Sequence, residues 1–134
     1  MIFIDSSAWL ALADRHDRSH AAARAFYGRV EGGEFGQPIT TNYVLQETLT
    51  LVARRLGPRR AGELAASIRQ SHQLTTFWIE RVHHEEAVAL MVQHEDKDWS
   101  VTDCSSFVVM RAIGADTAFS FDSDFAQAGF VVRP

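Results

Sequence analysis

The sequence predicts an α/β fold, in which a central parallel sheet is covered by helices on both faces. Short stretches of strand character recur along the chain, at residues 1–4, 38–41, 75–81, 117–121 and 130–132. Amphipathic stretches of helix length separate most of these runs. The 134 residues, of which 46% are hydrophobic, are enough to bury one independent core. We therefore expect a single domain over residues 1–134.

Polar caps and helix breakers delimit the helices of the first half. Ser6 or Ser7 can cap the helix after the first strand, and Ser19 can cap the next one. Asn42 is placed to cap the long helix after the second strand. The Gly57–Pro58 pair ends that helix, and its proline suits the first turn of a fourth. These boundaries predict helices over residues 8–13, 20–30, 43–56 and 58–72.

Two further helices are expected in the second half. Thr102 can cap the second of them, and Gly114 can close it in the left-handed conformation that follows many helices. The acidic run 95–98 between the two helices has no apolar pattern and is expected to be a loop. The helices are predicted over residues 83–94 and 103–113, and no repeat or linker interrupts the chain.

Four acids lie where a carboxylate is out of place unless it binds something: Asp5, Glu47, Asp103 and Asp122. Asp5 and Asp122 each end an apolar run of strand character. Glu47 borders the apolar arc of its helix, and Asp103 opens another helix. Side chains at the carboxyl ends of parallel strands point into one crevice. Carboxylates gathered there would repel one another unless a hard divalent cation lay between them, so the pattern favours a Mg²⁺ or Mn²⁺ site and phosphate chemistry.

Each acid also has a purely structural explanation. Asp5 could cap the first helix, although the serines after it could do so instead. Glu47 could reach water at the helix boundary, and Asp103 could stabilise the first turn of its helix through the helix dipole. Asp122 could belong to a turn. Asp124 is a competing ligand, but Asp122 lies closer to the end of the strand.

Composition and charge set limits on location and partners. The net charge of −4 and the pI near 5.8 are not those of a protein that holds nucleic acid by bulk positive potential. No apolar stretch approaches the roughly 20 residues of a membrane span. The N-terminus lacks the basic region of a signal peptide, and the single Cys104 rules out an internal disulfide. We therefore expect a cytoplasmic protein with no membrane association.

Four stretches of the chain resemble the motifs of PIN-domain ribonucleases, and most of all those of the VapC toxins of bacterial toxin–antitoxin pairs. The stretches are Ile4–Trp9 (IDSSAW), Thr41–Thr48 (TNYVLQET), Trp99–Phe107 (WSVTDCSSF) and Ser120–Phe130 (SFDSDFAQAGF). Their order, their spacing and the total length agree with that family over nearly the whole chain.

The resemblance implies a PIN fold, which is a three-layer α/β/α sandwich around a central parallel sheet. It also implies an endoribonuclease that depends on Mg²⁺ or Mn²⁺. Asp5, Glu47, Asp103 and Asp122 match the catalytic acidic quartet of the family. Asp5, Asp103 and Asp122 are then the expected metal ligands, and Ser6 matches the small polar residue beside the first acid.

The same resemblance implies three partners, namely an RNA substrate, a cognate antitoxin protein and a second copy of the chain in a homodimer. Apolar residues of the first two helices are expected to lie mostly in the core, with some of them forming a homodimer face and a groove for an antitoxin helix. These residues are Trp9, Leu10, Leu12, Phe26 and Tyr27.

Other classes of function are left open. A PIN fold could serve as a non-catalytic module that binds RNA or protein, although all four acids are present. A receiver-like signalling domain would need a lysine after a late strand, whereas the only lysine, Lys97, lies in a loop. An Asp-x-Asp phosphatase would need an aspartate where Ser7 stands. The six histidines show neither an H-x-x-H nor an H-E-x-x-H pattern, so a zinc site is not supported.

The middle of the chain, residues 58–95, carries no motif, so the RNA target is not predicted. Four arginines surround the turn at Gly57–Pro58. They form either a solvated helix junction or a contact for RNA phosphates. The arginines are Arg54, Arg55, Arg59 and Arg60.

Overall fold

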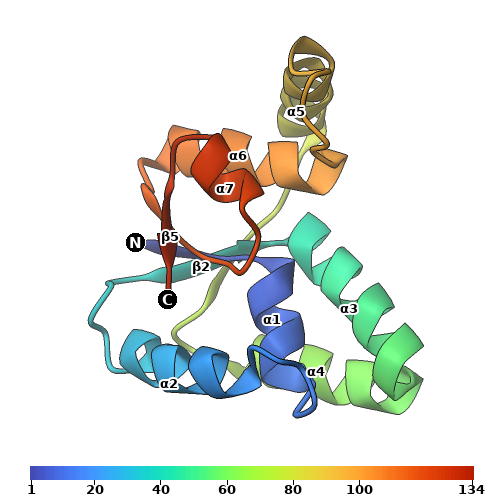
Figure 1. Ribbon diagram of the computed structural model, residues 1–134, viewed down its shortest axis with the longest axis vertical. Coiled ribbons are helices and arrows are strands. Elements are labelled where there is room, and N and C mark those ends of the chain that lie inside the picture. The colour runs from blue at the N-terminus through green and yellow to red at the C-terminus, as the bar shows by residue number, and fades with distance from the viewer.

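The computed structural model describes all of residues 1–134 and contains five strands and seven helices (Figure 1). The strands are β1 (Ile2–Ile4), β2 (Pro38–Thr41), β3 (Thr75–Phe77), β4 (Thr117–Phe119) and β5 (Val131–Arg133). The helices are α1 (Ser6–Ala13), α2 (His20–Glu31), α3 (Asn42–Leu56), α4 (Pro58–Gln70), α5 (Arg81–Gln93), α6 (Val101–Ile113) and α7 (Asp124–Gln127).

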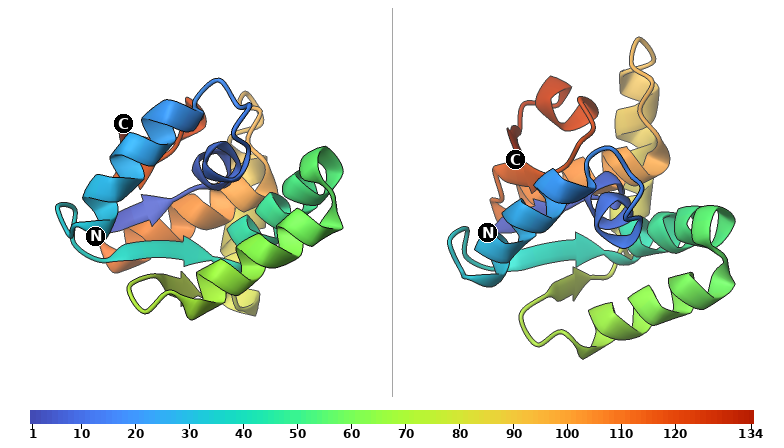
Figure 2. Two further views of the ribbon diagram at one scale, coloured as in Figure 1. Left: turned by 90° about the horizontal axis from the view of Figure 1, so that it is seen from below. Right: turned by 60° about the horizontal axis from the view of Figure 1, so that its bottom comes forward.

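All five strands are parallel and lie in the order β3-β2-β1-β4-β5. Helices α1, α2 and α4 lie on one side of the sheet and α6 and α7 on the other, with α3 packed on α4 and α5 on α6 (Figures 1 and 2). The predicted three-layer α/β/α sandwich is thereby confirmed. Because every strand runs the same way, all carboxyl ends meet at one edge. None of the helices is both long and apolar enough to cross a membrane.

The core is built around the central strand. Ile2, Phe3 and Ile4 of β1 are fully buried, as expected for a strand covered on both faces. Phe107 of α6 packs edge to face on Phe125 of α7, with ring centroids 5.1 Å apart. This packing fixes α6 and α7 against the sheet. It thereby also fixes Asp103, in the first turn of α6, and Asp122, just before α7.

Several predicted helix caps are wrong. The cap of α1 is Asp5, whose side chain accepts a hydrogen bond from the Ser7 backbone N–H at 3.2 Å, and not Ser6 or Ser7. Thr41 caps α3 in place of Asn42. Ser100 caps α6 in place of Thr102. In each case the true cap lies one or two residues earlier, within the uncertainty of a residue or two that is usual for helix ends.

Other boundaries differ in the same way. The strand expected over 75–81 ends at Phe77, and α5 begins at Arg81 instead of residue 83. The chain turns away from the sheet because the Ile79 N–H donates to Asn42 Oδ1, at 2.7 Å, and not to a neighbouring strand. The short helix α7 was expected only as a turn. Ser19 holds the N-cap position of α2 but makes no capping hydrogen bond.

Candidate functional site

Asp5 is the centre of the candidate site. It follows β1 in the middle of the sheet and is 3% exposed. Its Oδ2 atom accepts hydrogen bonds from Ser7 Oγ at 2.7 Å and from Ser120 Oγ at 2.9 Å, beside the capping bond from the Ser7 N–H. Ser120 is 115 residues away in sequence but directly follows β4, which pairs with β1. Burial raises the pKa of Asp5 more than these hydrogen bonds lower it.

The hydroxyls of Ser7 and Ser120 connect Asp5 to the loop after β4. Ser7 Oγ accepts from the Phe121 backbone N–H at 2.9 Å, and Ser120 Oγ accepts from the Asp122 backbone N–H at 3.0 Å. Each hydroxyl then donates its own proton to Asp5, so the carboxylate is held by donors that are themselves fixed. Ser120 was absent from the predicted site, because a serine after a strand has no local feature that sets it apart from a loop serine.

Glu47 is joined to Asp5 through Ser6. The Ser6 hydroxyl donates to Glu47 Oε2 at 2.6 Å and lies 3.4 Å from Asp5 Oδ1. Glu47 is half-buried on α3. Burial raises its pKa, and the charges of Asp5 and Asp122 add to the effect. Both the predicted acid and the small polar residue beside Asp5 therefore face the same point at the edge of the sheet.

Asp103 is the third residue of α6 and takes part in a reciprocal cap. Its Oδ2 accepts from the Ser100 backbone N–H at 2.8 Å, while Ser100 Oγ accepts from the Asp103 N–H at 3.0 Å. Burial raises the pKa of Asp103 to about 6, with added contributions from the charges of Asp5 and Asp122. The structural explanation for this acid is thus correct, and the acid also lies near the others.

Asp122 and Asp124 form the far side of the site. Asp122 Oδ1 accepts from the Asp124 backbone N–H at 2.9 Å, in the turn that opens α7. Burial raises the pKa of Asp124, and the charges of Asp122, Asp98 and Asp5 raise it further. Asp124 therefore lies within electrostatic range of Asp5 and Asp122, and Asp98 lies within range of Asp124.

The four predicted acids come together at the carboxyl edge of the sheet, where Glu47 and Asp103 each lie within electrostatic reach of Asp5 and Asp122. No group of three or more His, Cys, Asp or Glu side chains is arranged to hold a metal ion without movement. Asp103 illustrates why, since its carboxylate turns toward the N-terminus of its own helix. What the structure presents is an all-oxygen set of partly buried carboxylates whose mutual repulsion is only partly relieved by serine hydroxyls.

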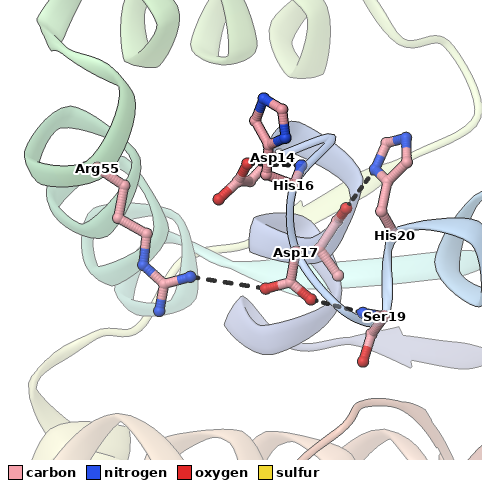
Figure 3. A network of polar contacts seen from close by, with 7 residues as sticks. Asp14, His16, Asp17, Ser19, His20 and Arg55 are labelled. Carbon is pink, nitrogen blue, oxygen red and sulfur yellow. Dashed lines mark hydrogen bonds and ion pairs between the residues drawn. The ribbon is translucent and has the colours of Figure 1, made fainter.

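The predicted basic cluster between α3 and α4 is largely paired with acids. Arg55 forms an ion pair with Asp17, at 3.6 Å, in the loop between α1 and α2 (Figure 3). Arg59 and Arg60 both pair with Glu63, at 3.7 and 3.1 Å. Asp17 also accepts a hydrogen bond from a backbone N–H of its own loop. These contacts favour the solvated helix junction over a contact for RNA phosphates.

Comparison with known proteins gives a consistent result. Residues 2–131 match the model of the PIN domain family. The chain is 40% identical over 135 residues to the 23S rRNA-specific endonuclease VapC20 of Mycobacterium tuberculosis, covering 100% of this chain and 99% of that protein. The crystal structure of VapC20, described as a sarcin–ricin loop cleaving toxin, has a TM-score of 0.90 and 38% identity over 100% of both chains.

A more distant structure supports the fold alone. FitAcB from Neisseria gonorrhoeae has a TM-score of 0.65 at 15% identity, covering 100% of this chain and 97% of the other. The resemblance to VapC toxins that the four motifs suggested is confirmed by the full-length match to VapC20. The family match spans nearly the whole sequence. The chain belongs to the PIN domain family.

Proposed function

We propose that the chain is an endoribonuclease that depends on Mg²⁺ or Mn²⁺ and acts as the toxin of a VapBC-type toxin–antitoxin pair. Its proposed substrate is 23S rRNA in the sarcin–ricin loop. The observation that carries the proposal is the acidic edge around Asp5 in a chain that is 40% identical, from end to end, to an rRNA-specific endonuclease. An enzyme with this substrate works in the cytoplasm, where ribosomes are.

The donor set fits a hard divalent cation. Asp5, Asp103 and Asp122 would hold the ion, since carboxylate oxygens are the ligands that Mg²⁺ prefers. Raised pKa values of Asp5 and Asp103 support this choice, because a cation would relieve the cost of their burial and mutual repulsion. Asp103 would have to turn away from Ser100 to take part. A bound ion supplies charge neutralisation at the scissile phosphate and a lower pKa for a coordinated water.

Glu47 is the proposed proton acceptor of the reaction. Its Oε2 is held by Ser6 at 2.6 Å, whereas Oε1 makes no hydrogen bond within the chain. Its raised pKa makes it a better base than an ordinary glutamate. Hydrogen bonds from Ser7 and Ser120 hold the carboxylate of Asp5 in one orientation. Asp122 shares the task of orienting the water.

The direct test is RNA cleavage by the purified protein. A synthetic hairpin with the sarcin–ricin loop sequence and intact 23S rRNA in ribosomes are incubated with the protein in Mg²⁺ or Mn²⁺. We expect cleavage at one site in both, abolished by EDTA and by Asp103→Asn. If the folded wild type binds these RNAs and cuts neither, the chain is a binding module with a PIN fold and the nuclease proposal fails.

Ser120→Ala tests how far the orientation of Asp5 matters. The change removes one donor to Asp5 Oδ2 and the acceptor for the Asp122 N–H, in a residue that is 1% exposed. We expect cleavage to fall by about 10- to 100-fold, as for other partners of metal-ligating side chains. Kinetics of the hairpin reaction measure it, with the exposed Ser67→Ala as the matched control. An unchanged rate in Ser120→Ala would mean that Asp5 needs no such support.

A groove between α1, α2 and α4 supports the proposed antitoxin partner. It has a volume of 810 Å³ and is open to solvent. Leu12, Tyr27 and Leu64 contribute apolar surface, and Arg24 and Arg60 are balanced by Glu31 and Glu63. An amphipathic helix whose apolar face enters the groove is the partner chemistry that fits such a lining. Of the apolar residues expected here or in a homodimer face, Trp9, Leu10 and Phe26 are buried in the interior instead.

The homodimer remains a proposal, supported by a second hollow of 340 Å³ beside β3. Trp78 is 68% exposed there, next to Leu45, Leu49 and Leu74. Such an exposed aromatic is typical of an interface. We expect wild-type protein at micromolar concentration to sediment as a dimer and Trp78→Glu as a monomer with an unchanged circular dichroism spectrum. A monomeric wild type would end the homodimer proposal.

A further inference from the structure

Aromatic side chains lie on both sides of the acidic site, along the carboxyl edge of the sheet. On one side, Tyr43 follows β2 and His84 lies beyond β3; on the other side, Phe121 follows β4. Asp5 follows β1, which lies between β2 and β4 in the sheet. The proposed catalytic acids therefore lie between two groups of rings.

Tyr43 links His84 to the acidic site. It lies four residues before Glu47 on α3, so the two side chains share one helix face, with Cβ atoms about 6 Å apart. The Tyr43 hydroxyl is 3.0 Å from Nδ1 of His84. The two rings meet edge to face, with centroids 6.1 Å apart at 68°. His84 is exposed and Tyr43 is half-buried, so the tyrosine holds an imidazole that remains open to solvent.

The position of Phe121 is fixed by a backbone hydrogen bond and by the packing of its ring. Its backbone N–H donates to Ser7 Oγ at 2.9 Å, and the same hydroxyl donates to Asp5. Its ring packs edge to face on the fully buried Phe119, with centroids 6.0 Å apart. Despite this packing, Phe121 is 37% exposed. An apolar ring that is partly open to solvent is thus kept beside the carboxylate cluster.

These rings fit the bases of single-stranded RNA. Loops and single strands are bound by stacking of splayed bases on Phe, Tyr and His side chains. Each stacked base strengthens binding without adding positive charge. That matters here, because the groups around Asp5 are carboxylates, and three of the four arginines between α3 and α4 are engaged with Asp17 and Glu63. Stacking can hold RNA across an edge whose own charge repels phosphate.

On the basis of the proposed ribonuclease function, we propose that one RNA strand crosses the carboxyl edge of the sheet from the β3 side to the β4 side. One base stacks on His84 and another, across the scissile phosphate, stacks on Phe121. Tyr43 is a positioning residue that holds His84 in the orientation for stacking.

The test measures kcat and KM for cleavage of the sarcin–ricin hairpin. We expect His84→Ala and Phe121→Leu each to raise KM roughly tenfold, the effect of losing one stacked base, with kcat little changed. His84→Phe and Phe121→Tyr keep a stacking face and should restore KM, whereas His84→Gln should not. Tyr43→Phe should raise KM less than His84→Ala does. His72→Ala, at an exposed histidine before β3 and thus at the opposite edge, is the matched control.

A second readout locates each contact on the RNA. Hairpins carrying 2-aminopurine on one side or the other of the cleaved bond are bound to the Asp103→Asn protein, and fluorescence quenching reports stacking. Adding His84→Ala should relieve quenching on one side only, and adding Phe121→Leu on the other. Unchanged KM and quenching in both variants, with an active wild type, would overturn the stacking proposal alone. A wild type that neither binds nor cuts RNA would overturn the ribonuclease function and the stacking proposal with it.

Discussion

Replacing Asp5 by asparagine is expected to abolish RNA cleavage while making the metal-free protein more stable. Asp5 is the most buried of the four acids, and its pKa is raised by that burial. Asparagine removes the buried charge and the proposed metal ligand, yet it caps a helix as well as aspartate does. We expect at least a 10²- to 10³-fold loss of cleavage, the size of effect seen when one electrostatic contact to a transition state is removed.

The matched variant is Asp5→Ala, which loses the same charge and also the cap of α1. Both variants should be inactive, but alanine should lower the free energy of unfolding by about 1 kcal/mol through the lost cap. Urea unfolding in EDTA compares the three proteins, and hairpin cleavage in Mg²⁺ measures activity. Substantial cleavage by Asp5→Asn would contradict the assigned role of this residue, as would a large loss of stability.

The second large effect concerns pH and metal together. The carboxyl of Asp103 has a pKa of about 6 in the folded chain, above the ordinary value, chiefly because of burial. Those of Asp5 and Glu47 are raised as well. For an acid whose folded pKa is raised, the folded state binds more protons than the unfolded one, so stability falls as pH rises toward and through the folded pKa. The metal-free protein should therefore lose stability between about pH 4 and pH 7.

Asp103 is only partly buried, so its own share is on the order of 1 kcal/mol after allowance for solvent screening. Urea unfolding at pH 5, 6, 7 and 8 in EDTA measures the decline. Asp103→Asn should flatten it, and Mg²⁺ at pH 8 should restore stability in the wild type, because the ion binds the folded state. Metal-free stability that rises from pH 5 to pH 8 would show that the clustered acids do not repel one another as proposed.

Much of the fold could be predicted because its signals are local. Apolar runs such as 1–4 identify strands, and the helical periodicity of 42–56 identifies α3, within a few residues in each case. The parallel orientation of the strands followed from their alternation with helices. The edges of elements were less predictable. Trp78 and Ile79 continue an apolar run but leave the sheet, since Ile79 donates to Asn42 instead of to a strand.

The candidate site was predictable as a set of acids and not as a network. Asp5 and Asp122 stood out because each ends an apolar run, Glu47 because it borders the apolar arc of its helix, and Asp103 because it opens a helix. Ser120 and His84 have no local sequence feature that would identify them as site residues. In the structure, Ser120 is hydrogen-bonded to Asp5 and His84 to Tyr43. Both contacts join segments that are distant in sequence, and no local pattern encodes which distant side chain will be met.

The sequence by itself therefore determined the α/β class, the PIN family and the four acids, because periodicity and motif spacing are properties of short segments. Only the tertiary structure decided that Asp5 caps α1 and accepts hydrogen bonds from Ser7 and Ser120, and that aromatic rings flank the acids on both sides. The physical reason is the parallel sheet. It places the carboxyl ends of β1, β2 and β4 at one edge, and the register of those strands, set by packing of the whole core, fixes which side chains meet there.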